Sequence, residues 1–354
     1  METSTTTRHE SADATDADGF TPLQVKRVVR ETSEAVSLVL DVPAASRARF
    51  LYLAGQFVTL RVTIDGAEHR RCYSMSSSPA VEPDLRITVK RDRDGLVSNW
   101  INDTVTAGDV LHTAPPEGRF VLTADDHDIV TFAGGSGITP VFSLVHSALA
   151  ATSRRARLFY ANRDLASVIF RDALAELTDT HSGRLEVHHH LDDLDGVVSP
   201  ERIADFIHSA GGHADTDYYV CGPAPFMDTV EQVLLDAGVP RQQVHLERFS
   251  VAAIPPPDPA EPVVTEEVTI ELGRTTTIAP YRAGNTLLQT ARLAGLKAPS
   301  SCETGSCGTC MAQVVEGSAR MVNNDALDDD EVAEGWVVTC QALPTSRRVR
   351  VVYE

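Results

Sequence analysis

Residues 302–310 read CETGSCGTC, and a fourth cysteine, Cys340, follows after 29 further residues. Thiols spaced Cys-x4-Cys-x2-Cys with a distant fourth are the plant-type arrangement around a [2Fe–2S] cluster. Gly305 and Gly308 lie between them, where a wrapping loop needs backbone that accepts positive φ. Structural zinc is the alternative, but zinc sites usually pair two short Cys-x2–4-Cys knuckles, and only one short pair is present. The spacing therefore predicts a cluster held by Cys302, Cys307, Cys310 and Cys340.

The length, composition and charge of the chain indicate what kind of protein carries this cluster. A chain of 354 residues predicts two or three domains, and 42% hydrophobic content is normal for globular proteins. No stretch approaches the ~18 apolar residues of a membrane span, and the N-terminus lacks the apolar core of a signal peptide, so we expect a cytoplasmic protein. The net charge of −19 argues against nucleic acid and anionic membranes as partners.

The chain upstream of the cysteines changes character twice. Residues 251–263 read VAAIPPPDPAEPV, a proline-rich linker. Before it, buried-strand runs such as 129–133 and 218–221 alternate with helical patterns such as 226–237, which predicts an α/β unit with a parallel sheet. Earlier still, short strands at 36–40, 57–62 and 85–89 predict an all-β unit, most simply an antiparallel β-barrel.

The predicted domains follow from these changes. They are a disordered tail (1–18), a β-barrel (19–124), an α/β domain (125–250), the linker (251–263) and a small α+β cluster domain (264–354).

Three motifs upstream could bind cofactors. Arg71-Cys72-Tyr73-Ser74 offers a cation for phosphate, an aromatic face and a hydroxyl, although a strand end with a satisfied arginine would read the same way. The second motif is the loop Gly134-Gly135-Ser136-Gly137-Ile138-Thr139-Pro140, which joins a strand to a helix as a pyrophosphate-binding loop does. Thr139 is the expected N-cap of that helix. The alternative is a tight turn that binds no ligand. Cys221-Gly222-Pro223 ends a later strand, where ligands of parallel sheets lie, or Cys221 is a small buried hydrophobe.

Taken in this order, the motifs resemble the ferredoxin–NAD(P)H reductase superfamily, and more narrowly the flavin and [2Fe–2S] reductase components of multicomponent oxygenases. Within that group the sequence is most similar to the reductases of 3-ketosteroid 9α-hydroxylases. The segments 54–57, 160–163 and 167–170 also fit the group. The resemblance implies a FAD-binding barrel, a NAD(P)H-binding α/β domain and a β-grasp ferredoxin domain.

The resemblance also implies a role for each matched residue. Ser74, Cys221 and Glu247 would be the catalytic set, with Ser74 beside flavin N5 and Cys221 beside the nicotinamide. The FAD-binding residues would be Arg71, Cys72, Tyr73, Ser74, Val89, Lys90, Gly95, Leu96, Val97, Ser98 and Phe249. The NAD(P)H-binding residues would be Gly135, Gly137, Thr139, Asn162, Arg163, Cys221, Gly222 and Pro223. Asp164 favours NADH, because an acid there would repel a 2′-phosphate, whereas Arg163 and Arg171 leave NADPH open.

The implied activity is an NADH-dependent oxidoreductase that passes electrons through FAD and [2Fe–2S] to a separate terminal oxygenase, such as a Rieske-type steroid hydroxylase. The alternatives are a fatty-acyl desaturase or di-iron epoxidase as partner, and, from another class, a non-catalytic electron carrier. We expect a monomer. His188-His189-His190 is not predicted to bind metal, because neighbouring strand residues face opposite sides. Residues 328–331 are expected to form a solvated acidic turn, with part of a docking face for a protein partner as the alternative.

Overall fold

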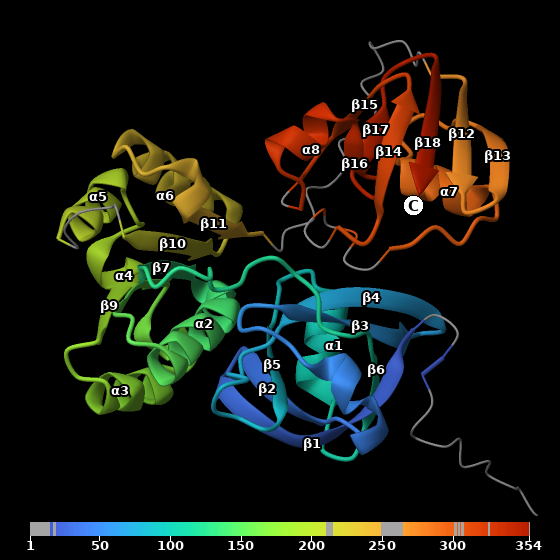
Figure 1. Cartoon of the computed structure of the whole chain (residues 1–354). Coiled ribbons are helices and arrows are strands. Elements are labelled where there is room, and N and C mark those ends of the chain that lie inside the picture. The colour runs from blue at the N-terminus through green and yellow to red at the C-terminus, as the bar shows by residue number, and fades with distance from the viewer. Residues whose placement is uncertain are drawn as a thin grey trace, which may run out of the picture. The chain divides into compact units, whose positions relative to one another are not determined.

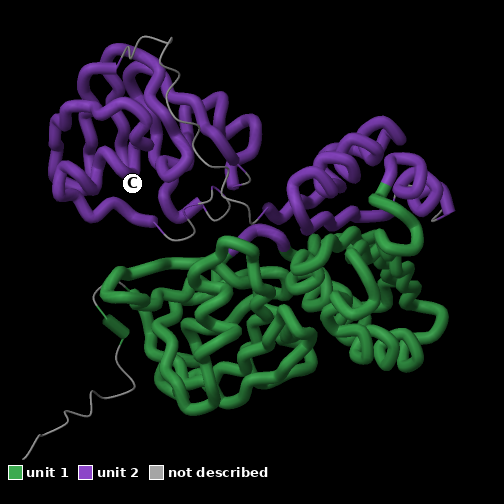
Figure 2. Tube along the Cα trace, turned by 180° about the vertical axis from the view of Figure 1, so that it is seen from behind, with its two compact units in different colours: residues 1–117, 121–198 green, residues 118–120, 199–354 purple. Residues whose placement is uncertain are grey.

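The computed structural model describes residues 15–16, 19–209, 215–248, 265–300, 303, 305, 308–324 and 326–353. The chain divides into two compact units, residues 1–117 with 121–198 and residues 118–120 with 199–354 (Figure 2). The linker predicted at 251–263 lies outside the described residues, as does the predicted tail apart from residues 15 and 16.

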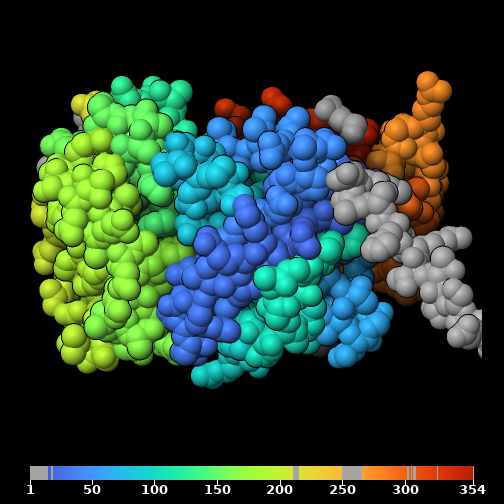
Figure 3. Space-filling model, turned by 90° about the horizontal axis from the view of Figure 1, so that it is seen from below, coloured from blue at the N-terminus to red at the C-terminus, as the bar shows by residue number. Residues whose placement is uncertain are grey.

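The N-terminal part is an antiparallel barrel of six strands in the order β4-β3-β6-β1-β2-β5 (Figure 1). Its strands are β1 (Thr21–Thr32), β2 (Ala35–Asp41), β3 (Phe57–Ile64), β4 (Ala67–Ser74), β5 (Leu85–Lys90) and β6 (Val110–Thr113). Alternating apolar residues such as Leu23, Leu38, Leu60 and Ile87 fill its core. Figure 3 shows the outer surface of this part, with β1 in blue; β1 pairs with β2 on one side and β6 on the other.

The barrel carries helical elements that the all-β prediction missed. The 3₁₀ helix η1 spans Ala44–Phe50, and helix α1 spans Leu96–Thr104. Val97 and Ile101 of α1, four residues apart, are buried in the barrel core. This helix is short and rich in Ser, Asn and Thr, so its helical pattern rests on those two residues alone.

The middle of the chain forms the predicted parallel sheet, with five strands in the order β11-β10-β7-β8-β9. The strands are β7 (Asp128–Gly134), β8 (Ala156–Asn162), β9 (Leu185–Leu191), β10 (Thr216–Cys221) and β11 (Val244–Glu247). The accompanying helices are η2 (Gly135–Gly137), α2 (Ile138–Ala151), η3 (Leu165–Ser167), α3 (Arg171–Thr180), α4 (Asp192–Asp195), α5 (Pro200–His208), α6 (Ala224–Asp236) and η4 (Arg241–Gln243).

The start of α2 differs from its prediction. Its N-cap is Gly137 rather than Thr139, and Thr139 lies in the first turn. The Thr139 hydroxyl donates to the Ser136 carbonyl at 3.0 Å instead of accepting from a backbone N–H. The three-residue helix η2 leads directly into α2 and moves the cap two residues upstream.

The C-terminal part is a β-grasp with a mixed sheet in the order β13-β12-β18-β14-β16 and a small sheet β15-β17 (Figure 1). Its elements are β12 (Glu267–Leu272), β13 (Thr275–Pro280), α7 (Leu287–Leu293), β14 (Met311–Glu316), β15 (Ala319–Met321), α8 (Asp329–Ala333), β16 (Trp336–Val338), β17 (Ala342–Pro344) and β18 (Arg348–Tyr353). The acidic run expected to be a turn forms the short helix α8, capped by Asp328. Val268, Ile270, Leu287 and Val351 lie in the core.

The predicted fold classes are therefore confirmed for all three parts of the chain. Within the residues that the structure describes, no helix combines the length and the apolar character needed to cross a membrane.

Helix α7 begins with a reciprocal cap that can be tested. The Thr286 hydroxyl accepts from the Gln289 N–H at 3.1 Å, and the Gln289 side chain accepts from the Thr286 N–H at 2.9 Å. Thr286→Ala should lower the free energy of opening α7 by about 1 kcal/mol, which speeds amide exchange of residues 287–293 roughly fivefold. Hydrogen-exchange mass spectrometry measures this. Thr276→Ala, on an exposed strand position, should leave that exchange unchanged; equal effects of both changes would contradict the cap.

Candidate functional site

The Arg71–Ser74 motif forms the end of β4, paired with β3 in a register that places Leu60 opposite Arg71 and Phe57 opposite Ser74. Arg71 is exposed, and its guanidinium donates to the Arg70 carbonyl at 2.7 Å. Tyr73 packs against the barrel core, and burial raises its pKa. The motif thus presents a cation to solvent and an aromatic ring to the barrel.

Ser74 closes this motif with a buried hydroxyl. The residue is only 3% exposed, and its Oγ has no hydrogen-bond partner within the described part of the chain. A buried unpaired hydroxyl costs free energy, so such groups usually mark the place of a ligand or water. The neighbouring serines differ, because Ser76 bonds to Thr88 and Ser78 to Ser147, each at 2.7 Å.

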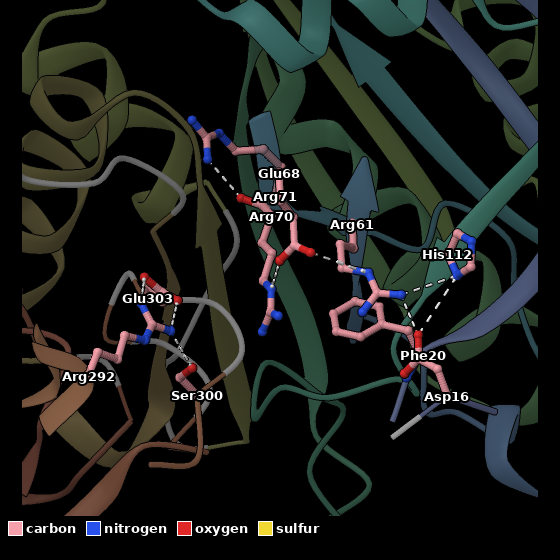
Figure 4. Close-up of polar contacts among 10 residues, drawn as sticks. All are labelled: Asp16, Phe20, Arg61, Glu68, Arg70, Arg71, His112, Arg292, Ser300 and Glu303. Atoms are coloured by element: carbon pink, nitrogen blue, oxygen red, sulfur yellow. Dashed lines mark hydrogen bonds and ion pairs between the residues drawn. The ribbon is translucent and has the colours of Figure 1, made fainter. Parts of the chain in front are cut away.

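Two further arginines, Arg61 on β3 and Arg70 on β4, lie against the ring of Phe20 (Figure 4). The guanidinium carbons of Arg61 and Arg70 lie 4.5 and 5.1 Å from the Phe20 ring centroid. Arg70 also bonds Glu68 at 3.0 Å, and Arg61 pairs with Asp16. These two arginines are therefore engaged within the protein, whereas Arg71 has no carboxylate partner among the described residues.

Val89 and the segment 95–98 lie where β5 and α1 approach. The Asn102 side chain donates to the Val89 carbonyl at 3.1 Å, which ties α1 to β5. Gly95 is the N-cap of α1, and a Cβ there would meet Ser98 Oγ at 2.3 Å, so no larger residue fits. The Ser98 hydroxyl closes the turn by donating to Gly95 and accepting from Asp92, so its side chain is structural in this conformation.

The glycine loop lies beside Lys90. Gly135 has a φ of +52°, and the Lys90 Nζ is 3.3 Å from the position that a Cβ on Gly135 would take. Burial lowers the pKa of Lys90, with the Arg163 charge as a second cause, while Glu34 and Asp164 act in the opposite direction. Sequence reasoning assigned Lys90 to the flavin; the structure brings its ammonium to the loop expected to bind the nicotinamide cofactor.

Arg163 and Asp164 follow β8, whose Ala161 pairs with Gly134 at the start of the glycine loop. Arg163 forms an ion pair of 2.6 Å with Glu34, between β1 and β2, a partner that the sequence did not suggest. Asp164 is the N-cap of η3 and accepts from the Ser167 N–H at 2.8 Å. Asn162, at the end of β8, is buried.

Cys221 and Glu247 are brought together by the parallel pairing of β10 and β11, which places them directly opposite each other. Both are buried, at 0% and 3% exposure. Burial raises the pKa of the Cys221 thiol, and the charge of Glu247 raises it further, so the thiol stays protonated at neutral pH. Gly222 and Pro223 then lead into α6, with Pro223 as its N-cap.

Two of the four predicted cluster ligands are described, and they lie close together. Thr339, next to Cys340, donates to the Cys310 carbonyl through its N–H at 3.2 Å and its hydroxyl at 2.8 Å. Both cysteines are buried, and their proximity contributes to raising the pKa of Tyr353 to about 12, after burial itself. Gly305 and Gly308 have φ of +91° and +75°, as predicted. Cys302, Cys307 and Phe249 lie outside the described residues.

The donor sets fit the implied groups. A buried hydroxyl without a partner at Ser74, and the exposed Arg71 three residues earlier on β4, suit a flavin with phosphate. A glycine turn with an ammonium against it suits a pyrophosphate. Two buried cysteines joined by one threonine suit a thiolate-ligated cluster.

The histidine run does not form such a set. The rings of His188 and His190 both stack on Phe159, at 5.1 and 5.6 Å, whereas His189 lies against Tyr160. The three side chains therefore face opposite sides of β9. Among the described residues no group of three or more His, Cys, Asp or Glu side chains could hold a metal ion.

Family models match three successive segments of this chain. They are an oxidoreductase FAD-binding domain (residues 21–122), an oxidoreductase NAD-binding domain (132–232) and a 2Fe-2S iron-sulfur cluster binding domain (270–345).

Similar proteins match the chain over almost its full length. The ferredoxin reductase component of 3-ketosteroid-9-alpha-monooxygenase from Rhodococcus rhodochrous is 38% identical, over 94% of this chain and 96% of that protein. A subunit of 1,2-phenylacetyl-CoA epoxidase from Escherichia coli (strain K12) is 31% identical, over 95% and 98%. Among solved structures, phthalate dioxygenase reductase matches with a TM-score of 0.62 and 27% identity, over 95% of this chain and 98% of that one. The chain therefore belongs to the flavin and [2Fe–2S] reductase components of multicomponent oxygenases, which transfer electrons from NADH through FAD and the cluster to a separate oxygenase.

Proposed function

We propose that this protein supplies electrons to the oxygenase of a 3-ketosteroid 9α-hydroxylase system. The observation that carries the proposal is the 38% identity to the reductase component of such a system along nearly the whole of both chains. A di-iron epoxidase is the second candidate partner, supported by the 31% identity to the subunit of 1,2-phenylacetyl-CoA epoxidase. We also propose that the protein works as a cytoplasmic monomer, without nucleic acid as a partner, in keeping with its net charge of −19.

The proposed domain limits are those expected from the sequence: tail 1–18, FAD domain 19–124, NAD(P)H domain 125–250, linker 251–263 and ferredoxin domain 264–354.

Within the first domain, we propose that Ser74 donates to the flavin ring and that Arg71 and the N-terminus of α1 hold its phosphates. The unpaired Ser74 hydroxyl and the exposed Arg71 guanidinium support these roles. Tyr73 and Cys72 would flank the flavin, and Val89 and residues 95–98 would shape its phosphate side. The packing of Ser98 into its own turn favours phosphate contact through backbone N–H groups there rather than through its hydroxyl.

In the second domain, Gly135, Gly137 and Thr139 would bind the nicotinamide cofactor's pyrophosphate, helped by Lys90, whose ammonium lies against Gly135. Asn162 and Arg163 would line its adenosine side. Cys221, Gly222 and Pro223 would lie at the nicotinamide, and the neutral thiol of Cys221 would present an apolar, unreactive wall there. Glu247, which lies opposite Cys221, and Phe249 would complete the flavin-binding set that the resemblance implies.

Cys302, Cys307, Cys310 and Cys340 would hold the cluster in the third domain. When bound, FAD accepts an electron pair from NADH and the [2Fe–2S] cluster passes electrons on one at a time. The chain's own contribution is to bind, orient and exclude water around these groups.

The proposed partner can be tested by reconstitution. Purified protein and NADH should support steroid 9α-hydroxylation by a 3-ketosteroid hydroxylase oxygenase, with product formed in proportion to the NADH consumed. A di-iron epoxidase supplied with its own substrate serves as the matched alternative, and product analysis separates the two reactions. If coupled turnover were faster with the epoxidase than with the steroid hydroxylase, the epoxidase would be the favoured partner and the first proposal would be wrong.

The cluster ligands can be tested separately from the flavin. Cys340→Ser should remove the visible absorption and EPR signal of the cluster, because one of four thiolates is lost. NADH-dependent reduction of ferricyanide should continue, since it needs the flavin and nicotinamide sites only. The exposed Thr276→Ala variant should keep both properties. A Cys340→Ser protein that retained its EPR signal would rule out this ligand.

The Ser74 hydroxyl should matter to the flavin and not to the fold. Ser74→Ala should leave the free energy of unfolding of flavin-free protein unchanged or higher, because an unpaired buried hydroxyl is removed, and should weaken FAD binding about five- to tenfold. Fluorescence titration of apoprotein with FAD measures the affinity. Ser78→Ala should do the reverse, costing about 1 kcal/mol of stability through its bond to Ser147 with FAD affinity retained. An unchanged FAD affinity in Ser74→Ala would exclude the proposed contact.

A further inference from the structure

Arg292, in the last turn of α7, bonds the chain on both sides of Cys302 (Figure 4). Its Nη2 donates to the Ser300 hydroxyl at 2.7 Å and to Glu303 Oε1 at 2.5 Å, and its Nη1 donates to Glu303 Oε2 at 3.2 Å. This is a two-pronged arginine–carboxylate pair, the geometry that fixes position most firmly. Sequence reasoning gave no role to either partner.

Glu303 is held in an unusual conformation at this point. Its φ is +58°, in the left-handed region that favours glycine, although it carries a long side chain. Its main-chain carbonyl accepts from the Gln341 side chain at 2.8 Å, and Gln341 follows Cys340 directly. Arg292 and Gln341 thus fix the residue after Cys302 through its side chain and its backbone. A residue kept left-handed in this way needs surrounding contacts that compensate for the strain.

The ion pair is linked to the cysteine segments through hydrogen bonds. The Gln341 side chain, which bonds the Glu303 carbonyl, follows Cys340. Thr339, which precedes Cys340, bonds the Cys310 carbonyl and accepts from the Tyr353 hydroxyl at 3.0 Å. Arg292 is exposed and Glu303 is half-buried, at 41% and 38% of their side-chain surfaces, so solvent weakens the effect of their charges on neighbouring groups. The ion pair therefore lies at Glu303, the residue after Cys302 in the sequence, and Gln341 joins Glu303 to the segment that carries Cys340.

We propose that Arg292 and Glu303 are positioning residues that set the reduction potential of the cluster, with opposite effects. Reduction adds one negative charge to the cluster. The Arg292 cation favours the reduced form, and the Glu303 carboxylate opposes it. This inference rests on the assignment of the four cysteines as cluster ligands. It goes beyond that assignment by identifying which charges tune the electron transfer.

The test is the midpoint potential of the cluster, measured by EPR-monitored redox titration of the intact protein. Arg292→Gln should make the cluster harder to reduce and Glu303→Gln easier, each by about two- to tenfold in the reduction equilibrium, where tenfold corresponds to 59 mV. The double variant should return close to the original potential. A purely structural role would loosen the loop in both single variants and move both potentials in the same direction, or lose the cluster in both; either result overturns the proposal.

A second ion pair in the same part of the chain serves as the matched control. Arg348 Nε lies 2.8 Å from Glu267, on β18 and β12. Arg348 is five residues from Tyr353, which corresponds to ~16 Å along a strand and exceeds the screening length of ~8 Å. Arg348→Gln and Glu267→Gln should leave the potential unchanged. An equal shift in these controls would also overturn the proposal, whereas absence of a cluster signal in the unmodified protein would reject the proposed function instead.

Discussion

Gly305, in the cysteine loop, has room for backbone and for little else. A Cβ on Gly305 would lie 2.7 Å from the Asn323 carbonyl oxygen, closer than side-chain atoms tolerate, and both Gly305 and Gly308 take positive φ. Neighbouring elements contribute hydrogen bonds to the described residues around this loop. Helix α7 contributes Arg292, the segment after β16 contributes Thr339 and Gln341, and the last strand contributes Tyr353. The β-grasp frame is the support that this bend requires.

At the proposed nucleotide sites, too, short segments contribute a small number of specific groups. Ser74 keeps a hydroxyl unpaired in a buried place, and Gly135 keeps a surface open against Lys90. Ser74 leaves a polar group unsatisfied, and the buried apolar residues of the surrounding barrel and parallel sheet carry the stability. Sites that bind a charged cofactor often depend on such a division between a stable frame and an incomplete centre.

Sequence reasoning predicted the architecture because its signals are periodic. The strands expected at 57–62 and 129–133 lie within β3 and β7, and the helix expected at 226–237 overlaps α6, because partial alternation, a continuous apolar run and helical spacing mark them; the cysteine spacing is specific to one type of cluster. It failed where an interaction joins residues far apart in the sequence. Nothing local reveals that Lys90 reaches Gly135 or that Glu34 pairs with Arg163. Helix α1 was not predicted because only a few apolar residues mark its buried face. The N-cap of α2 was predicted wrongly because a short glycine-containing turn, η2, precedes the helix.

The register that places Cys221 opposite Glu247 affects how easily the Cys221 thiol is oxidised in air. Peroxide and other oxidants attack the thiolate form of cysteine, and a thiol that is fully buried and faces a carboxylate stays protonated. A reductase that works beside oxygen chemistry is exposed to partially reduced oxygen whenever electrons escape. The burial of Cys221, with the Glu247 charge as a second cause, thus disfavours the thiolate form that such oxidants attack.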